Sequence, residues 1–142
     1  MSNSLKISIV DDNKFFREGL RFFIESETDW TITQEEESGL SLIDKGFLII
    51  PDIVLMDINM PKLNGIETTF NLLNGYSRTE IKFIAITLHS DRYHIEALIK
   101  AGFRGCILKK DVYSELKQAV EKVHTNGLYF KHSSIRKLQN KL

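Results

Sequence analysis

The sequence predicts a doubly wound α/β domain, in which helices cover both faces of a five-stranded parallel sheet. Short apolar runs alternate with amphipathic helical patterns up to His124, and such alternation is typical of parallel strands joined by crossover helices. The third run, residues 53–56, is apolar at every position. Such a strand is expected in the middle of a parallel sheet, where helices bury both of its faces.

Each predicted strand is a short run of apolar or β-branched residues that ends at polar or turn-forming ones. The five runs are residues 5–10, 30–34, 53–57, 81–87 and 105–109. Three glutamates at positions 35–37 close the second run. Pro61 follows the third, and it has no backbone N–H with which to continue a central strand. Asn64-Gly65 then supplies turn chemistry before the next helix.

The predicted helices carry apolar residues at helical spacing. Their apolar stripes are Phe16, Leu20, Phe23 and Ile24; Leu40, Leu42, Ile43 and Phe47; Ile66, Phe70 and Leu73; Ile95, Leu98 and Ile99; and Val112, Leu116, Val120 and Val123. The first helix spans about residues 13–26, with Asp12 or Asn13 as its N-cap. We expect Gly102 to end the fourth helix and Asp111 to cap the fifth.

Length and composition favour one domain with a balanced surface charge. The chain has 142 residues, of which 42% are hydrophobic, and its 19 basic and 19 acidic side chains cancel. Domains that bind nucleic acid themselves carry a basic excess, which is missing here. A lone cysteine excludes an internal disulfide. Because neither a membrane span nor a signal peptide is evident, we expect a cytoplasmic protein.

The domain is predicted to span residues 1–125. After Asn126-Gly127 the pattern weakens, and from Lys131 onward the tail is basic and contains no acidic residue. We expect residues 126–142 to form a short helix or a linker towards an output domain.

Polar side chains at four of the strand ends form the candidate site, because these ends meet along one edge of a doubly wound sheet. They are Asp11, Asp12, Asp57, Thr87 and Lys109. Taken singly, such an aspartate is usually a helix cap, the threonine structural and the lysine solvated. Together, the crowded carboxylates favour a hard cation such as Mg²⁺. A hydroxyl and an ammonium beside them suit a phosphoryl group, with Asp57 as its nucleophile.

Over roughly residues 7–123 the chain resembles the receiver domain of bacterial two-component response regulators. The residues that carry the resemblance are Ile9-Val10-Asp11-Asp12-Asn13, Asp52-Ile53-Val54-Leu55-Met56-Asp57-Ile58-Asn59-Met60-Pro61 with Asn64-Gly65, Thr87 and Lys109. The stretches 87–91 and 105–111 are most similar to receivers attached to LuxR-type helix-turn-helix output domains. The resemblance implies a flavodoxin-like (βα)5 fold with strand order 2-1-3-4-5.

The resemblance also implies a role for each acidic residue. Asp57 would accept a phosphoryl group from the phosphohistidine of a histidine kinase. Asp12, Asp57 and the backbone carbonyl of Asn59 would bind Mg²⁺ directly, and Asp11 would act largely through water. The protein would be a signalling receiver rather than a classical enzyme, limited to self-catalysed phosphotransfer and slow autodephosphorylation.

Further expectations concern the switch and the partners. Thr87 and Lys109 would each bind a phosphoryl oxygen, and His89 would orient water or fill the rim of the site. Phosphorylation would switch an output, and with it transcription, with a homodimer as one expected form. DNA would be bound only through an output domain absent from this chain.

Three departures from the family pattern affect the switch. Many receivers carry a tyrosine or phenylalanine at the position of Cys106, and its rotation reports phosphorylation together with Thr87. Many also have a cis-proline where this chain has Lys110. Leu88 is larger than the residue often found beside the threonine. Redox sensing by Cys106 is a second hypothesis, although a thiol within a strand is more often inert.

Three alternative functions fit the residues less well. A haloacid-dehalogenase-type phosphatase needs a second aspartate two residues after its nucleophile, where this chain has Asn59. A receiver-like interaction module that never takes phosphate usually lacks an acidic residue or the lysine. A flavin-binding domain needs a loop rich in serine, threonine and glycine after the first strand, whereas the stretch Asp11-Asp12-Asn13 would repel its phosphate.

Overall fold

The computed structural model describes residues 4–76, 80–88 and 92–130. Its strands are β1 (Lys6–Val10), β2 (Thr31–Glu36), β3 (Ile53–Asp57), β4 (Lys82–Thr87) and β5 (Gly105–Leu108). Its α-helices are α1 (Lys14–Glu27), α2 (Gly39–Lys45), α3 (Gly65–Leu73), α4 (Arg92–Ala101) and α5 (Val112–His124), and a 3-10 turn spans Lys109–Asp111. No helix in these described ranges combines the length and the apolar character that crossing a membrane requires.

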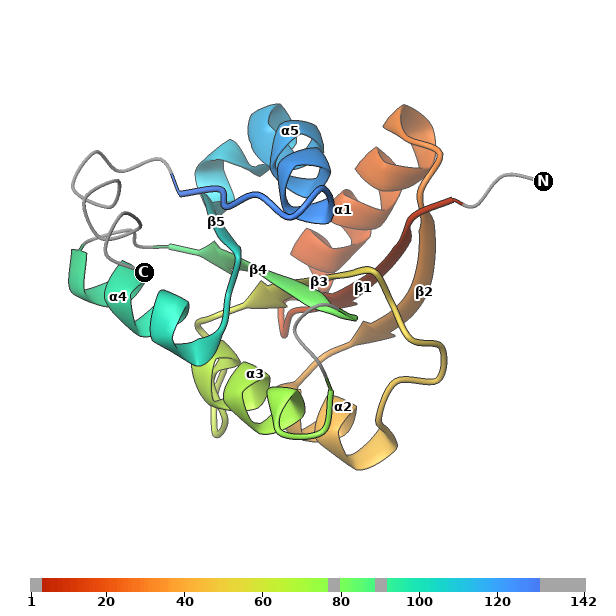
Figure 1. The fold of residues 1–142 in the computed structure, drawn as a ribbon. Helices are drawn as coiled ribbons and strands as arrows, with labels where there is room; N and C mark the ends of the chain where they lie inside the picture. Colours follow the sequence, from red (N-terminus) through yellow and green to blue (C-terminus); the bar gives the residue numbers. More distant parts are fainter. Residues whose placement is uncertain (1–3, 77–79, 89–91, 131–142) are drawn as a thin grey trace.

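The strands form one parallel sheet in the order β2-β1-β3-β4-β5, as predicted. Helices α1 and α5 cover one face of the sheet, and α2, α3 and α4 cover the other (Figure 1). The central strand β3 is buried at every position. Its uninterrupted apolar run is therefore the result of helices on both sides.

Alternate residues of each strand point to opposite faces of the sheet, so the core has two halves. In β3, Ile53 and Leu55 pack with the buried side chains of α1 and α5. Val54 and Met56 pack with those of α2, α3 and α4. Burial of such side chains is the main stabilising contribution to the fold.

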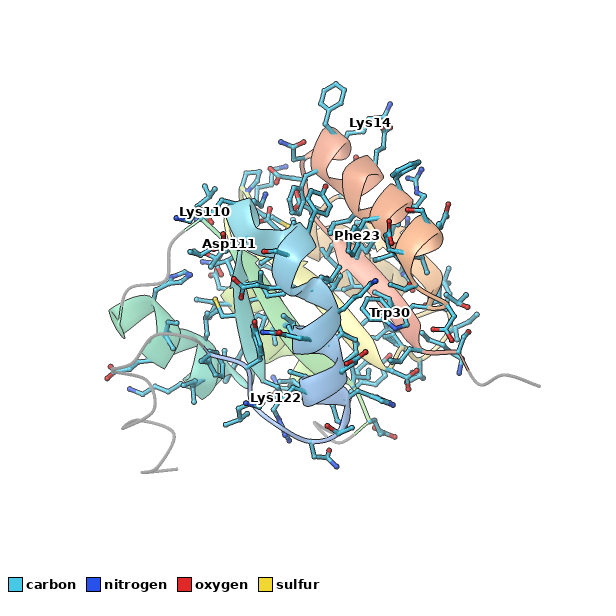
Figure 2. The ribbon with its side chains drawn as sticks, turned by 90° about the horizontal axis from the view of Figure 1, so that it is seen from above. Lys14, Phe23, Trp30, Lys110, Asp111 and Lys122 are labelled. Carbon is cyan, nitrogen blue, oxygen red and sulfur yellow. The ribbon has the colours of Figure 1, made fainter. Side chains whose placement is uncertain are left out.

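Figure 2 views the face of the molecule that α1 and α5 cover. Phe23 of α1 lies between these helices, with its ring centroid 5.3 Å from that of Tyr113 of α5. Lys14 and Lys110, beside the starts of the two helices, lie towards one end of the molecule, and Trp30 lies towards the other (Figure 2). The carboxyl ends of the strands lie near the helix starts. The candidate site is therefore at the end of the molecule where Lys14 and Lys110 lie.

Local signals set the ends of three helices. Asn13, rather than Asp12, caps α1, because its side chain accepts the Phe16 N–H at 3.0 Å. Asn64 caps α3 in a reciprocal capping box. Gly102 ends α4 with a positive φ of 109°, which a residue without a side chain adopts freely.

The end of β2 was predicted wrongly. The strand continues through Glu36 instead of stopping at Gln34. Glu36 is buried and accepts hydrogen bonds from Gln34 at 2.9 Å and Ser41 at 2.6 Å, and Lys45 lies 3.2 Å away. An acidic residue tolerates burial when it is paired in this way, and these hydrogen bonds hold the pKa of Glu36 below its usual value against the opposing effect of burial.

Three further expectations, for a helix cap, a strand end and an apolar stripe, were wrong. Asp111 stands at the N-cap of α5, but its side chain makes no capping hydrogen bond. The 3-10 turn leads into α5 instead, and it includes Lys109, which was assigned to β5. Phe70 is 58% exposed, because it borders a groove between α3 and α4 rather than the core.

The chain after α5 returns to the sheet and pairs with the edge of β5. Tyr129 donates its N–H to the Arg104 carbonyl at 2.9 Å, and its own carbonyl accepts the Cys106 N–H at 2.9 Å. The Tyr129 hydroxyl donates to a Glu115 carboxylate oxygen at 2.8 Å. Tyr129 and Phe130 are both buried. This segment therefore covers an edge that would otherwise expose unpaired backbone groups.

Residues 126–142 were expected to form a short helix or a linker. Asn126 instead adopts a positive φ of 71°, and Gly127 donates to a carbonyl in the last turn of α5 at 2.8 Å, which turns the chain back. The packed unit thus reaches at least Phe130. The remainder of the tail lies outside the described residues.

Candidate functional site

Asp57 is placed by the end of β3 and by the loop that follows it. The N–H of Ile58 donates to the Ile86 carbonyl at 3.2 Å, and the N–H of Gly65 donates to the Ile58 carbonyl at 3.1 Å. A Cβ atom at position 65 would collide with the carbonyl oxygen of Asp57 and the Cα of Ile58. Glycine at this position therefore allows the loop to fold tightly over the strand end.

Three carboxylates gather at this edge, as predicted. Carboxylate oxygens of Asp11, Asp12 and Asp57 lie within 4.8 Å of one another. Asp11 and Asp57 are buried, and Asp12 is exposed. The N–H of Asn13 donates to Asp11 Oδ1 at 2.8 Å, and the N–H of Asn59 donates to Asp57 Oδ1 at 3.2 Å.

Lys109 brings one positive charge to the acidic cluster. Its Nζ lies 3.2 Å from Asp11 Oδ2 and 3.6 Å from Asp57 Oδ1. The same ammonium lies 4.6 Å from the centroid of the Phe16 ring, which adds a cation–π contact. The 3-10 turn after β5 thus places the Lys109 ammonium close to two carboxylates.

The three carboxylates carry more negative charge than the Lys109 ammonium neutralises. Burial, and next the charge of Asp11, raise the pKa of Asp57 to about 7, although Lys109 opposes this rise. Among the described residues, Asp57 Oδ2 is buried without a hydrogen-bond partner. A buried oxygen without a partner is costly. Carboxylate oxygens that include two without a hydrogen bond in the described chain, Asp11 Oδ2 and Asp57 Oδ2, form a donor set that fits a hard divalent cation such as Mg²⁺.

Thr87 lies at the end of β4, next to the strand that carries Asp57. In the β3–β4 register Asp57 pairs with Ile86, and Thr87 follows one residue later. Thr87 is fully buried, and its Oγ1 lies 2.9 Å from Nε2 of His94 in the first turn of α4. Sequence reasoning missed His94, because a histidine near a helix start is usually a surface residue and its spacing from Thr87 follows no motif.

Two of the remaining candidates are also placed by the structure. The side-chain Oδ1 of Asn59 accepts the Leu88 N–H at 3.4 Å, which connects the loops after β3 and β4. Cys106 is buried opposite Ala85, and burial, followed by the charge of Glu115, raises its pKa to about 12. A thiol that stays protonated is a weak nucleophile, which argues against redox sensing. His89 lies outside the described residues.

Residues 7–121 match the family described as the response regulator receiver domain. The chain belongs to this family. The receiver domain is 33% identical over 127 residues to the transcriptional regulatory protein DegU of Brevibacillus brevis, covering 89% of this chain and 53% of DegU. It is 25% identical over 138 residues to the response regulator protein VraR of Staphylococcus saprophyticus, covering 97% and 65% respectively. The chain therefore spans between about half and two thirds of these relatives.

Solved structures share the fold of this receiver. A LuxR-family two-component response regulator from Aurantimonas sp. SI85-9A1 has a TM-score of 0.85 at 24% identity over 98% of both chains. The RcsB response regulator of Salmonella typhimurium has a TM-score of 0.81 at 20% identity, over 99% of this chain and 69% of that one. Family membership sets aside the haloacid-dehalogenase-type phosphatase and the flavin-binding domain.

Proposed function

We propose that this receiver domain accepts a phosphoryl group on Asp57 from the phosphohistidine of a histidine kinase. The observation that carries the proposal is the state of Asp57, a buried carboxylate with an unpaired oxygen and a pKa of about 7, set between two other aspartates and Lys109. Structural acids in cores are paired, as Glu36 is. An unsatisfied one at the carboxyl edge of a parallel sheet is a candidate reaction centre.

Mg²⁺ is the proposed cofactor. Asp12 and Asp57 would hold it directly together with the backbone carbonyl of Asn59, and Asp11 would act largely through water. When bound, the ion neutralises the charge of the carboxylates and stabilises the negative charge on the phosphoryl oxygens. Lys109 adds a charge that the protein itself supplies.

The transfer step makes modest demands on the protein's own residues. A carboxylate oxygen of Asp57 bonds to phosphorus as the phosphorus–nitrogen bond of the donor breaks, and the electron pair remains on the imidazole nitrogen. Asp57 must be ionised to attack, which Lys109 favours. Lys109 and Thr87 would then each bind a phosphoryl oxygen, so positioning and charge neutralisation account for most of the catalysis.

The output is proposed to be transcription. DegU is a transcriptional regulatory protein and only 53% of its length is matched here, which suits a receiver linked through the tail that follows Phe130 to a DNA-binding domain. Thr87 is the proposed start of the switch, with the small Cys106 shifting little. A homodimer formed on phosphorylation is a further proposal. Because the kinase makes its phosphohistidine from ATP, we place the reaction in the cytoplasm.

Acetyl phosphate with Mg²⁺ is expected to add one phosphoryl group to the protein. Intact-mass analysis should show the adduct in the wild type, no adduct in EDTA, and none in Asp57→Asn. Asp44→Asn, an exposed aspartate of α2, is the matched control and should react like the wild type.

A non-phosphorylated interaction module gives the opposite result. In that case the wild type, although folded, would gain no mass under any condition. An adduct that persists in Asp57→Asn would move the phosphoacceptor elsewhere.

A further inference from the structure

The Thr87–His94 hydrogen bond joins the end of the sheet to the first turn of α4. The distance between Thr87 Oγ1 and His94 Nε2 is 2.9 Å, and the Thr87 side chain is fully buried. Ile95 and Leu98 of α4 pack in the core. The bond is thus a polar contact at the start of a helix that also packs on the core.

The hydroxyl of Thr87 has a single proton to donate. Within the described chain, Asp57 Oδ2 has no hydrogen-bond partner, so this proton is not donated to it. A neutral imidazole that carries its proton on Nδ1 accepts at Nε2, and Thr87 is then the donor to His94. A phosphoryl oxygen on Asp57 would compete with His94 for the same proton.

We propose that His94 is a positioning residue that holds the Thr87 hydroxyl on α4 in the unphosphorylated receiver. Binding of a phosphoryl group at Asp57 takes this hydroxyl and releases the first turn of α4. The inference rests on the proposed function, because it needs Thr87 to bind a phosphoryl oxygen. It adds a residue that opposes phosphorylation and couples the phosphorylation site to α4.

The energetic consequence follows from the two-state balance. A ligand shifts an equilibrium by its differential affinity for the two states. A contact made only in the resting state therefore lowers the affinity for a ligand that prefers the other state. A hydrogen bond of ordinary strength changes an equilibrium about fivefold. Removal of the His94 acceptor should therefore tighten binding of a phosphoryl mimic by about this factor.

The test compares beryllofluoride affinity in the presence of Mg²⁺ for the wild type, His94→Phe and His94→Gln. The phenylalanine ring keeps the bulk of the imidazole without its nitrogen, and glutamine keeps a polar atom within reach. We expect His94→Phe to bind about fivefold tighter, and His94→Gln to remain near the wild type. His124→Phe, at an exposed histidine of α5, is the matched control and should change nothing.

A second measurement needs no variant. Long-range ¹H–¹⁵N spectra of the His94 imidazole report the environment of Nε2, and this signal should shift when beryllofluoride binds to the wild type. An unchanged Nε2 signal, or equal or weaker binding by His94→Phe, overturns the inference. If the wild type and Asp57→Asn both fail to bind beryllofluoride, the proposed function fails instead, so the two failures are distinguishable.

Discussion

Asp57→Asn will stabilise the metal-free fold at pH 8 although it removes the phosphoacceptor. The folded protein raises the pKa of Asp57 from 3.8 to about 7, first through burial and next through Asp11. A raised pKa means that the folded state binds the proton more tightly than the unfolded chain does. The stabilising contribution is therefore complete below about pH 4 and is lost as the pH rises through about 7.

The expected size follows from that shift. Roughly three pKa units correspond to at most about 4 kcal/mol, and relaxation of the partly solvated cluster reduces this to about 2 kcal/mol. The melting temperature of Asp57→Asn in EDTA should thus exceed that of the wild type by roughly 6 °C at pH 8. At pH 5 the difference should be smaller, and it should vanish only below about pH 4.

The same measurement has two internal checks. Mg²⁺ at pH 8 should raise the melting temperature of the wild type far more than that of Asp57→Asn, because the ion relieves the same repulsion. Asp44→Asn should show no pH-dependent gain. A difference between Asp57→Asn and wild type that is equal at pH 5 and pH 8 would show that burial of charge at Asp57 is not its cause.

Lys109→Met should give the largest loss of both stability and reactivity. The side chain keeps its length but loses the ammonium that lies 3.2 Å from Asp11 and 3.6 Å from Asp57. Leaving buried carboxylates unpaired costs about 3 kcal/mol. Losing a charge that stabilises the transferred phosphoryl group should slow modification by acetyl phosphate by at least about 100-fold.

Urea unfolding at pH 8 and timed intact-mass analysis measure the two effects. Lys110→Met is the matched control, because Lys110 is the adjacent exposed lysine and should tolerate the same change. The double variant Asp57→Asn/Lys109→Met should recover part of the lost stability, since one of the two unpaired charges is gone. Equal effects of the two lysine variants would contradict a specific role for Lys109.

Much of the fold followed from the sequence because its local signals agree with each other. The apolar run of β3, the Asn13 cap of α1 and the positive φ at Gly102 each need only neighbouring residues. Glu36 breaks the apolar pattern at the end of β2, yet it is buried, because Ser41 and Lys45 reach it from α2. A partner supplied by another element leaves no signal in a local pattern.

In the candidate site, too, some residues could be predicted from the sequence and others could not. Topology alone brings Asp11, Asp12 and Asp57 together, because strand ends of a parallel sheet meet at one edge. His94 depends on how the first turn of α4 is placed over Thr87, which periodicity does not determine. The pairing of Tyr129 with β5 was missed as well, since a stretch this short has no strand-like alternation.

The central claim, that Asp57 is the phosphoacceptor, is tested most directly by locating the phosphoryl group on the chain. Sodium borohydride reduces an aspartyl phosphate to homoserine, which marks the modified residue permanently. After treatment with acetyl phosphate and Mg²⁺ followed by borohydride, peptide mass spectrometry should find homoserine at position 57. Homoserine at position 11 or 12 with an unmodified Asp57, or no homoserine in a protein that has gained a phosphoryl group, would contradict the assignment.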